Sequence, residues 1–350
     1  MAYLTLADGT EYKGVSFGYE GDTIGEVVFN TGITGYQELL TDPTYATQIV
    51  NMTYPLIGNY GVNPEDTESD SPKARGLIVR DYCDTPSNWR SKGTLKDYLV
   101  QNKIVAIHSI DTRALTRKLR DEGTMACLIT QDKPTLEQLT ALKNYKAQNP
   151  VLEVTTKIPY EIKNSGKTLA VIDYGVTKHV LSALKDLGYN IKVFPSFATA
   201  DEILASNPDG IFLSGGPGDP KDNVQSIEEV KKLIGKKPIY AICLGHQILA
   251  LAKGGDTVKL KYGHRGSNHP VKDLETGKVV ITSQAHGYAV VEDSIKSIAK
   301  VTHVNVNDGT VEGIEYNDGL CYSLQYHPES LSGPNTENRV FEKFAKVLSK

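Results

Sequence analysis

Short apolar runs and stretches of helical spacing alternate along the second half of the chain. The runs have the length of buried strands and comprise residues 169–172, 191–194, 211–213 and 239–242. After the first run, apolar residues recur at helical spacing from Val180 to Leu187, and Gly188 follows as a stop signal. Thr199 and Glu202 have the spacing of a capping box at the start of the next helix. Strands that alternate with helices predict an α/β fold with a doubly wound, mostly parallel sheet.

The first 130 residues have a different pattern. β-branched and aromatic runs such as Val27 to Phe29 are separated by many Gly and Pro residues, which predicts a β-rich α+β domain. The length of 350 residues exceeds that of one ordinary domain. We therefore predict an N-terminal domain over 1–150, a polar linker over 151–166 and a second domain over 167–350. The second domain is expected to end in an amphipathic helix over 335–348.

Composition and charge exclude several classes of protein. With 39% hydrophobic and 23% charged residues, the chain has the composition of a globular protein. The net charge of -4 and the scattered Lys and Arg residues argue against nucleic-acid binding. The start lacks a basic segment followed by an apolar core, and no apolar run approaches the roughly 18 residues of a membrane span. We expect a cytoplasmic protein that does not enter a membrane.

Cys243 stands where a buried strand meets a helix, in the run Ala241-Ile242-Cys243-Leu244-Gly245. A small residue two positions after the cysteine is typical of a nucleophile elbow, here with Cys in place of Ser. The positive end of the helix dipole and the unpaired N–H groups of the first turn favour a thiolate at this point. The alternative is a small buried cysteine without a chemical role.

His327 and Glu329 follow a late strand in the run Gln325-Tyr326-His327-Pro328-Glu329. Pro328 keeps His327 out of the helical region, and residues two apart in an extended segment point to the same side. A carboxylate at one ring nitrogen would fix the tautomer and leave the other nitrogen for a thiol. A turn with a solvated Glu329 is the alternative.

A glycine-rich loop from Ser214 to Pro220 follows the strand at 211–213. Doubly wound folds place ligands at such carboxyl ends of strands. The loop lacks the Gly-Lys-Ser/Thr of a phosphate loop and the dinucleotide fingerprint. Its Gly216 N–H and the N–H of Leu244 are candidates for stabilising an oxyanion, and a plain tight turn is the alternative.

The remaining cysteines and histidines are expected to be structural. Cys321 lies six extended residues, or roughly 20 Å, from His327, so it cannot use that base. Cys83 and Cys127 have neither a helix start nor a nearby base, and no C-x-x-C pair indicates zinc or a disulfide. His264 and His269 have a spacing that a metal can use, but no carboxylate or thiol accompanies them in the sequence. We expect no metal and no cofactor on this chain.

The chain resembles the class I (triad) glutamine amidotransferases in three motifs, which are the Gly216-Pro217-Gly218 loop, Cys-Leu-Gly-His-Gln at 243–247 and His327-Pro328-Glu329. Several motifs in the first half resemble the small subunit of carbamoyl phosphate synthetase, and they lie at 25–31, 34–38, 41–43 and 110–113. Two motifs in the second half, at 263–264 and 268–271, resemble the same subunit. The resemblance therefore spans nearly the whole chain.

The resemblance implies that the chain hydrolyses L-glutamine, with Cys243 as nucleophile, His327 as base and Glu329 as the residue that orients it. Ammonia would pass through a tunnel to a large subunit that holds ATP, Mg and bicarbonate and makes carbamoyl phosphate for arginine or pyrimidine synthesis. The N-terminal domain would contact that subunit. By motif position, the glutamine site would include Thr44, Gly216, Gly218, Leu244, Gln247, Gly287 and Tyr288.

Two positions differ from the family pattern. Thr44 stands where the family often has Ser, and either hydroxyl donates a hydrogen bond. Ala285 stands where the family usually has Asn, so a site that needs a side-chain amide would lose it, whereas one that uses the backbone would not. Two other functions remain open at this point. One is a stand-alone cysteine hydrolase for glutamyl amides, and the other is a non-enzymatic scaffold.

Overall fold

The computed structural model describes residues 1–329 together with 345 and 348. The chain divides into two compact units, 1–148 and 149–350, and each is considered by itself. The helix predicted over 335–348 lies almost entirely outside the described residues. Each helix within the described part of the chain is too short or too polar to span a membrane.

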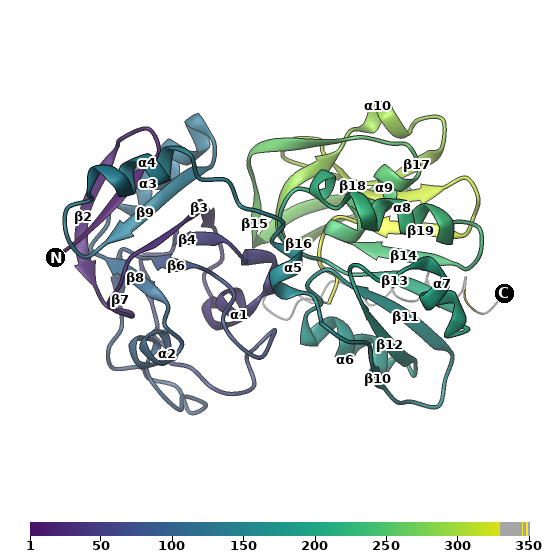
Figure 1. Cartoon of the computed structure of the whole chain (residues 1–350), viewed down its shortest axis with the longest axis horizontal. Coiled ribbons are helices and arrows are strands. Elements are labelled where there is room, and N and C mark those ends of the chain that lie inside the picture. Colours follow the sequence, from purple (N-terminus) through teal and green to yellow (C-terminus); the bar gives the residue numbers. More distant parts are fainter. Residues whose placement is uncertain (330–344, 346–347, 349–350) are drawn as a thin grey trace. The chain divides into compact units, whose positions relative to one another are not determined.

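The first unit is built on a closed β-barrel (Figure 1). The strands follow one another around the barrel in the order β1 (Ala2–Leu6), β2 (Glu11–Ser16), β8 (Val105–His108), β6 (Gly76–Ile78), β4 (Gln48–Met52), β3 (Thr23–Asn30) and β9 (Met125–Thr130). Alternate residues such as Leu4 and Leu6 point into a buried apolar cluster. Leu115 and Leu119 join this cluster from one face of a helix. Because the barrel is closed, each strand pairs with a neighbour on both sides and no sheet edge is left open.

Helices and a small second sheet complete the first unit. They are α1 (Tyr36–Thr41), η1 (Pro43–Tyr45), α2 (Leu95–Gln101), α3 (Thr112–Glu122), α4 (Leu136–Lys143), β5 (Leu56–Ile57) and β7 (Asp81–Tyr82). The helix α4 begins with a capping box in which Thr135 and Gln138 bond reciprocally.

The second unit contains one large mixed sheet (Figure 1). Its strands lie in the order β10 (Tyr160–Ile162), β12 (Asn190–Pro195), β11 (Thr168–Asp173), β13 (Gly210–Leu213), β14 (Ile239–Ile242), β19 (Cys321–Leu324), β18 (Val311–Tyr316), β17 (Ala299–Asn305), β15 (Thr257–Asp273) and β16 (Val279–Val290). The strands from β12 to β19 pair in parallel. The pairs on either side of this block are antiparallel, so the predicted parallel arrangement holds for the centre of the sheet only.

The helices of the second unit are α5 (Val151–Val154), α6 (Lys178–Asp186), α7 (Ala200–Ala205), η2 (Pro220–Asp222), α8 (Val224–Leu233), α9 (Leu244–Ala252) and α10 (Glu292–Ile295). Of these, α6 packs on one face of the parallel block, and α7, α8 and α9 pack on the other. In β11, Leu169 and Val171 pack in the same cluster as the α6 side chains, while Ala170 and Ile172 pack with α7, α8 and α9. This alternation is the period of two that a strand covered on both faces requires. The doubly wound arrangement follows from it.

The segment predicted as a linker over 151–166 has regular structure. It contains α5 and β10, and β10 pairs with β12 at the edge of the sheet. The structure thus places this segment in the second unit. Its polar composition suits an edge strand, whose side chains are largely exposed.

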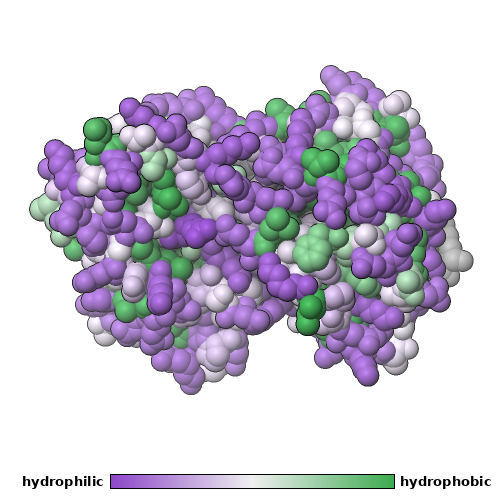
Figure 2. Space-filling view, in the orientation of Figure 1, coloured by the Kyte–Doolittle hydropathy of each residue, from purple (hydrophilic) through white to green (hydrophobic). Residues whose placement is uncertain are grey.

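The visible surface of each unit is mainly hydrophilic, and hydrophobic residues are scattered over it (Figure 2). Scattered apolar side chains are normal on the surface of a folded protein. The apolar residues that dominate the sequence pattern lie instead in the clusters described above.

Candidate active site

Cys243 occupies a strained turn between β14 and α9. Its backbone has φ 50° and ψ -112°, a left-handed φ that a side chain rarely adopts. Such a conformation costs about 1–3 kcal/mol and persists only when neighbouring contacts hold it. Here the Cys243 N–H donates to the Leu324 carbonyl at 2.9 Å, and the Gly245 N–H donates to the Ser214 carbonyl at 2.9 Å. The predicted nucleophile elbow has this geometry.

Gly245 allows the turn to close. A Cβ at this position would lie 2.4 Å from the carbonyl oxygen of Leu213, a distance that no side chain tolerates. The small residue two positions after the cysteine is therefore required by the close approach of α9 to β13.

The Cys243 side chain is buried and faces β16. Its Sγ lies 3.8 Å from the backbone carbonyl oxygen of Ala285, within the range of a weak S–H···O contact. The contact is made by the main chain, which alanine supplies as well as asparagine does. Having Ala285 where the family usually has Asn therefore leaves this contact with Cys243 Sγ unchanged.

His327 and Glu329 lie together, as their spacing predicts. His327 Nδ1 is 2.9 Å from Glu329 Oε1, and both side chains are almost entirely buried. The His327 N–H donates to the Ser283 carbonyl at 2.9 Å, so the segment after β19 is tied to β16. This bond and Pro328 keep the segment extended.

The other ring nitrogen of His327 is directed to the cysteine side of the site. Nε2 is buried and makes no hydrogen bond within the described residues. Burial lowers the His327 pKa, but the charges of Cys243 and Glu329 outweigh it and hold that pKa well above its usual value. The electrostatics therefore favour the protonated form of the His327 ring.

The glycine loop closes the site from the β13 side. A Cβ on Gly215 would lie 3.1 Å from His327 Cε1 and 3.4 Å from Cys243 Cβ, so this residue packs against both. A Cβ on Gly216 would lie 2.3 Å from the Tyr174 carbonyl oxygen. The loop is anchored because Ser214 Oγ accepts from the Tyr174 N–H and donates to the Gly215 carbonyl, each at 2.9 Å. Gly218, with φ +90°, adopts a conformation that glycine favours.

Gln247 joins the three segments that carry the site. Its Nε2 donates to the Tyr288 carbonyl at 2.7 Å and to Gln325 Oε1 at 2.9 Å. Tyr288 lies on β16 and Gln325 lies two residues before His327. Gln247 itself is on α9, one turn after Cys243. The Gln247 amide therefore links α9 to β16 and to the segment that carries His327.

The other predicted glutamine-site residues are placed as follows. Leu244 is the first residue of α9, and Gly287 precedes Tyr288 on β16. Thr44 belongs to the first unit, in η1, where its N–H donates to Asp42 Oδ1 at 2.9 Å. Their contacts with glutamine remain predictions.

Of the residues expected to be structural, Cys127, Cys321 and His246 are buried, whereas Cys83 is only partly buried. Burial raises the pKa of the Cys321 thiol to about 12, and it also raises the pKa of Cys127. His246 Nδ1 lies 2.8 Å from Ser323 Oγ, and burial lowers the His246 pKa to about 3. A neutral, packed His246 fits the structural role predicted for it.

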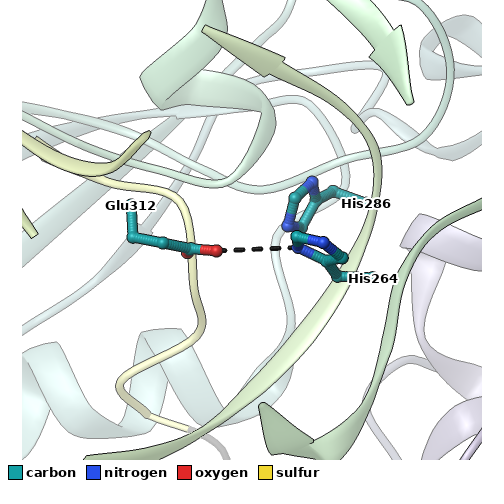
Figure 3. Close-up of side chains that lie close together, drawn as sticks. All are labelled: His264, His286 and Glu312. Atoms are coloured by element: carbon teal, nitrogen blue, oxygen red, sulfur yellow. Dashed lines mark ion pairs between the residues drawn. The ribbon is translucent and has the colours of Figure 1, made fainter. Parts of the chain in front are cut away.

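One group of side chains could hold a metal ion and was not found in the sequence. The ligand atoms of His264, His286 and Glu312 all lie within 4.8 Å of one another (Figure 3). The sequence pattern points to His264 but to neither of its neighbours, because His286 lies on β16 and Glu312 lies on β18. The register of β15 against β16, which sets His264 opposite His286, was the missing information.

The amide of Gln284 hydrogen-bonds to all three members of this group. Its Oε1 lies 3.0 Å from His264 Nδ1 and 2.8 Å from His286 Nε2, and its Nε2 donates to Glu312 Oε1 at 3.0 Å. Zinc would need these ligand atoms at about 2.0–2.2 Å from the ion. An ion could enter only by displacing the Gln284 amide.

Comparison with known families agrees with this geometry. Residues 170–347 match the family described as glutamine amidotransferase class-I, and residues 4–129 match the carbamoyl-phosphate synthase small chain, CPSase domain. A carbamoyl phosphate synthase small chain of Clostridium perfringens is 50% identical over 99% of both chains. One of Caldanaerobacter subterraneus is 52% identical over 99% of this chain and 96% of its own, and one of Syntrophotalea carbinolica is 46% identical over 100% and 98%.

The elbow, the loop and the mixed α/β sheet thus belong to a class I glutamine amidotransferase domain. With its first domain included, the chain belongs to the family of carbamoyl phosphate synthase small chains.

Proposed function

We propose that this chain is the glutaminase subunit of a carbamoyl phosphate synthetase and that Cys243, His327 and Glu329 hydrolyse L-glutamine. The observation that carries the proposal is the buried Cys243 on a strained turn beside His327, whose Nδ1 is held by Glu329 at 2.9 Å. A nucleophile, a base and a residue that orients the base are the parts that acyl transfer needs.

The reaction begins with attack of the Cys243 thiolate on the side-chain amide carbon of glutamine. A C–S bond forms, and the C–N bond breaks as His327 Nε2–H gives its proton to the departing ammonia. The product is a γ-glutamyl thioester. His327, now neutral, takes a proton from water, and the hydroxide attacks the thioester to release glutamate and restore the thiolate. The raised pKa of His327 suits this role, because it keeps a proton available beside the thiolate.

Backbone N–H groups stabilise the oxyanion that forms at the amide oxygen. We assign this role to Gly216, on the loop that packs against the site, and to Leu244 at the start of α9. Each such donor contributes about 3 kcal/mol to the stability of the transition state. The glutamine itself is bound by Thr44, Gly216, Gly218, Leu244, Gln247, Gly287 and Tyr288, which match the positions used in the family.

Ammonia passes to a large subunit that binds ATP, Mg and bicarbonate and forms carbamoyl phosphate. The first domain, over 1–150, is proposed to contact that subunit, because relatives with this domain are synthase small chains. The product supplies arginine or pyrimidine synthesis in the cytoplasm. This chain needs no metal or cofactor of its own for the hydrolysis.

A Cys243→Ser variant tests the chemistry. We expect glutamine hydrolysis to be abolished while the thermal unfolding curve stays close to that of the wild type. Survival of hydrolysis in a folded Cys243→Ser protein would show that another group is the nucleophile.

Co-purification from the source cell tests the partner and separates the subunit from a stand-alone hydrolase. We expect a much larger ATP-binding chain to be recovered and glutaminase activity to rise with ATP and bicarbonate. A monomeric protein with full activity and no response to either ligand would instead indicate a stand-alone hydrolase.

A further inference from the structure

The peptide between Gly215 and Gly216 carries the N–H group to which we assign the oxyanion. Neither residue has a Cβ, so the backbone itself does little to fix how this peptide is turned. The peptide is trans, and its C=O and N–H groups therefore point in opposite directions. A contact that holds the Gly215 carbonyl oxygen thus also sets the direction of the Gly216 N–H.

The Ser214 side chain makes this contact. Its Oγ donates to the Gly215 carbonyl oxygen at 2.9 Å and accepts from the Tyr174 N–H at 2.9 Å. A hydroxyl has a single proton, and because the Tyr174 N–H occupies a lone pair of Oγ, that proton is directed to the Gly215 carbonyl. Ser214 is completely buried, so water does not compete for either bond.

The Ser214 main chain ties the same loop to the nucleophile elbow. Its carbonyl accepts from the Gly245 N–H at 2.9 Å, and its N–H donates to the Ile172 carbonyl at 3.2 Å. Gly245 directly follows Leu244, whose N–H is the second group to which we assign the oxyanion. Ser214 is therefore bonded both to the peptide of the first donor and to the turn that carries the second.

The residue that orients the Ser214 hydroxyl is itself held firmly. Tyr174 follows Asp173, whose carboxylate accepts from the Gly175 N–H at 2.8 Å and from the Thr156 N–H at 2.7 Å. The Tyr174 hydroxyl accepts from Ser226 Oγ at 2.7 Å, and the whole side chain is buried. The Tyr174 N–H is thus a fixed point from which the Ser214 hydroxyl is oriented.

We propose that Ser214 is a positioning residue that turns the Gly216 N–H toward the oxyanion and sets its place relative to the Leu244 N–H. The inference rests on the proposed hydrolysis of glutamine at Cys243. The Ser214 hydroxyl is engaged by Gly215 and Tyr174, so it acts through the peptide. Its effect is larger in the transition state, because an N–H binds an oxyanion more strongly than it binds a neutral amide oxygen.

Steady-state kinetics of Ser214→Ala in the full-length chain test this role. We expect kcat to fall about thirtyfold, part of the effect of losing one oxyanion donor, and KM for glutamine to change by less than about threefold. Ser226→Ala is the matched control. It also removes a buried serine hydroxyl bonded to Tyr174, but it leaves the bond to Gly215 in place, and it should keep the wild-type kcat. An equal loss of kcat in both variants would overturn the proposal.

Alkylation of Cys243 by iodoacetamide separates a misplaced donor from a damaged nucleophile. The thiolate attacks a saturated carbon and displaces iodide, so no oxyanion forms and the rate follows the thiolate. We expect Cys243 to be alkylated at the same rate in Ser214→Ala and in the wild type, as measured by mass spectrometry of the peptide that contains it. Alkylation that slows in step with kcat would show that the substitution acts on Cys243, and this would refute the role.

Nuclear magnetic resonance observes the peptide directly, whether or not the chain hydrolyses glutamine. The sequence contains two Gly-Gly peptides, Gly215–Gly216 and Gly254–Gly255. Glycine labelled with ¹³C at the carbonyl and with ¹⁵N therefore gives one carbonyl–amide correlation for each, and Gly254→Ala identifies the second by its loss. We expect the Gly215–Gly216 correlation to shift in Ser214→Ala and to stay in place in Ser226→Ala, with Gly254–Gly255 as the internal reference. An unmoved Gly215–Gly216 correlation in Ser214→Ala would refute the positioning role alone.

Ser214→Cys keeps the test valid if Ser214→Ala does not fold. A thiol has a similar size and is a weaker hydrogen-bond donor than a hydroxyl. We expect kcat to fall and the Gly215–Gly216 correlation to shift in the same direction as in Ser214→Ala. A wild-type kcat together with an unmoved correlation in Ser214→Cys would overturn the proposal.

Discussion

Glu329 Oε1 lies 2.9 Å from His327 Nδ1, and the two side chains are 3% and 8% exposed. Because both side chains are shielded from solvent, the carboxylate fixes one tautomer of the His327 ring and attracts the positive charge of the ring more strongly than it would in water. The spacing of two residues across Pro328 produces this pair locally. Cys243, whose charge also acts on His327, lies far away in the sequence, in the turn between β14 and α9.

The pair predicts the effect of Glu329→Gln on the pH profile. Burial lowers the His327 pKa and two negative neighbours raise it, so removal of one of them lets the pKa fall. Activity that needs the imidazolium is present below this pKa and is lost above it. The alkaline limb of kcat/KM should therefore move to lower pH, and kcat should fall about a hundredfold. Stopped assays of glutamate release from pH 6 to 10 measure both. An unshifted limb would mean that Glu329 does not act on His327.

Gly245→Ala tests the close approach at the elbow. A Cβ would lie 2.4 Å from the Leu213 carbonyl oxygen, which is backbone and cannot move aside. We expect a loss of about 2–4 kcal/mol in the free energy of unfolding and a large loss of hydrolysis, measured by urea denaturation and glutamate release. Gly93→Ala is the control, because its Cβ would meet Val62 Cγ2 at an ordinary 3.6 Å. Equal stability of the two variants would contradict the prediction.

Cys321→Ala tests whether the elbow alone selects the nucleophile. Burial raises the Cys321 pKa to about 12, so its thiolate is scarce at neutral pH. We expect kcat/KM to stay within about threefold of the wild type, and the loss of the buried sulfur to lower the free energy of unfolding by about 1 kcal/mol. Chemical labelling with an electrophilic glutamine analogue should still modify the variant at Cys243. Loss of labelling in Cys321→Ala with the fold intact would refute the assignment.

Several elements follow from the sequence because their signals are local. The buried strands at 169–172 and 239–242 agree with β11 and β14 to within a residue or two, and the capping box at Thr199 and Glu202 is present. Each is set by residues within a few positions of one another. The same holds for the pairing of His327 with Glu329.

Other features depend on strand register, which the sequence pattern does not contain. β15 runs over Thr257–Asp273 with polar residues and irregular pairing, so it has neither strict alternation nor an apolar run. Its register against β16 brings His264 to His286, and β18 adds Glu312. The contact of Ala285 with Cys243 likewise arises only when β16 is placed beside the elbow.

Gln247→Leu tests the link between the helix and the two segments beside it. The substitution removes hydrogen bonds of 2.7 Å to the Tyr288 carbonyl and of 2.9 Å to Gln325 Oε1 and leaves the buried Gln325 without this donor. We expect the free energy of unfolding to fall by about 1–3 kcal/mol. Because segment 285–288 loses its tie to α9, KM for glutamine should rise about tenfold, with a smaller change in kcat. Gln225→Leu is the control, since Gln225 donates to the Phe197 carbonyl from an exposed position on α8. A change in kcat alone, with KM equal to that of the control, would show that Gln247 acts on the chemistry and not on the binding segment.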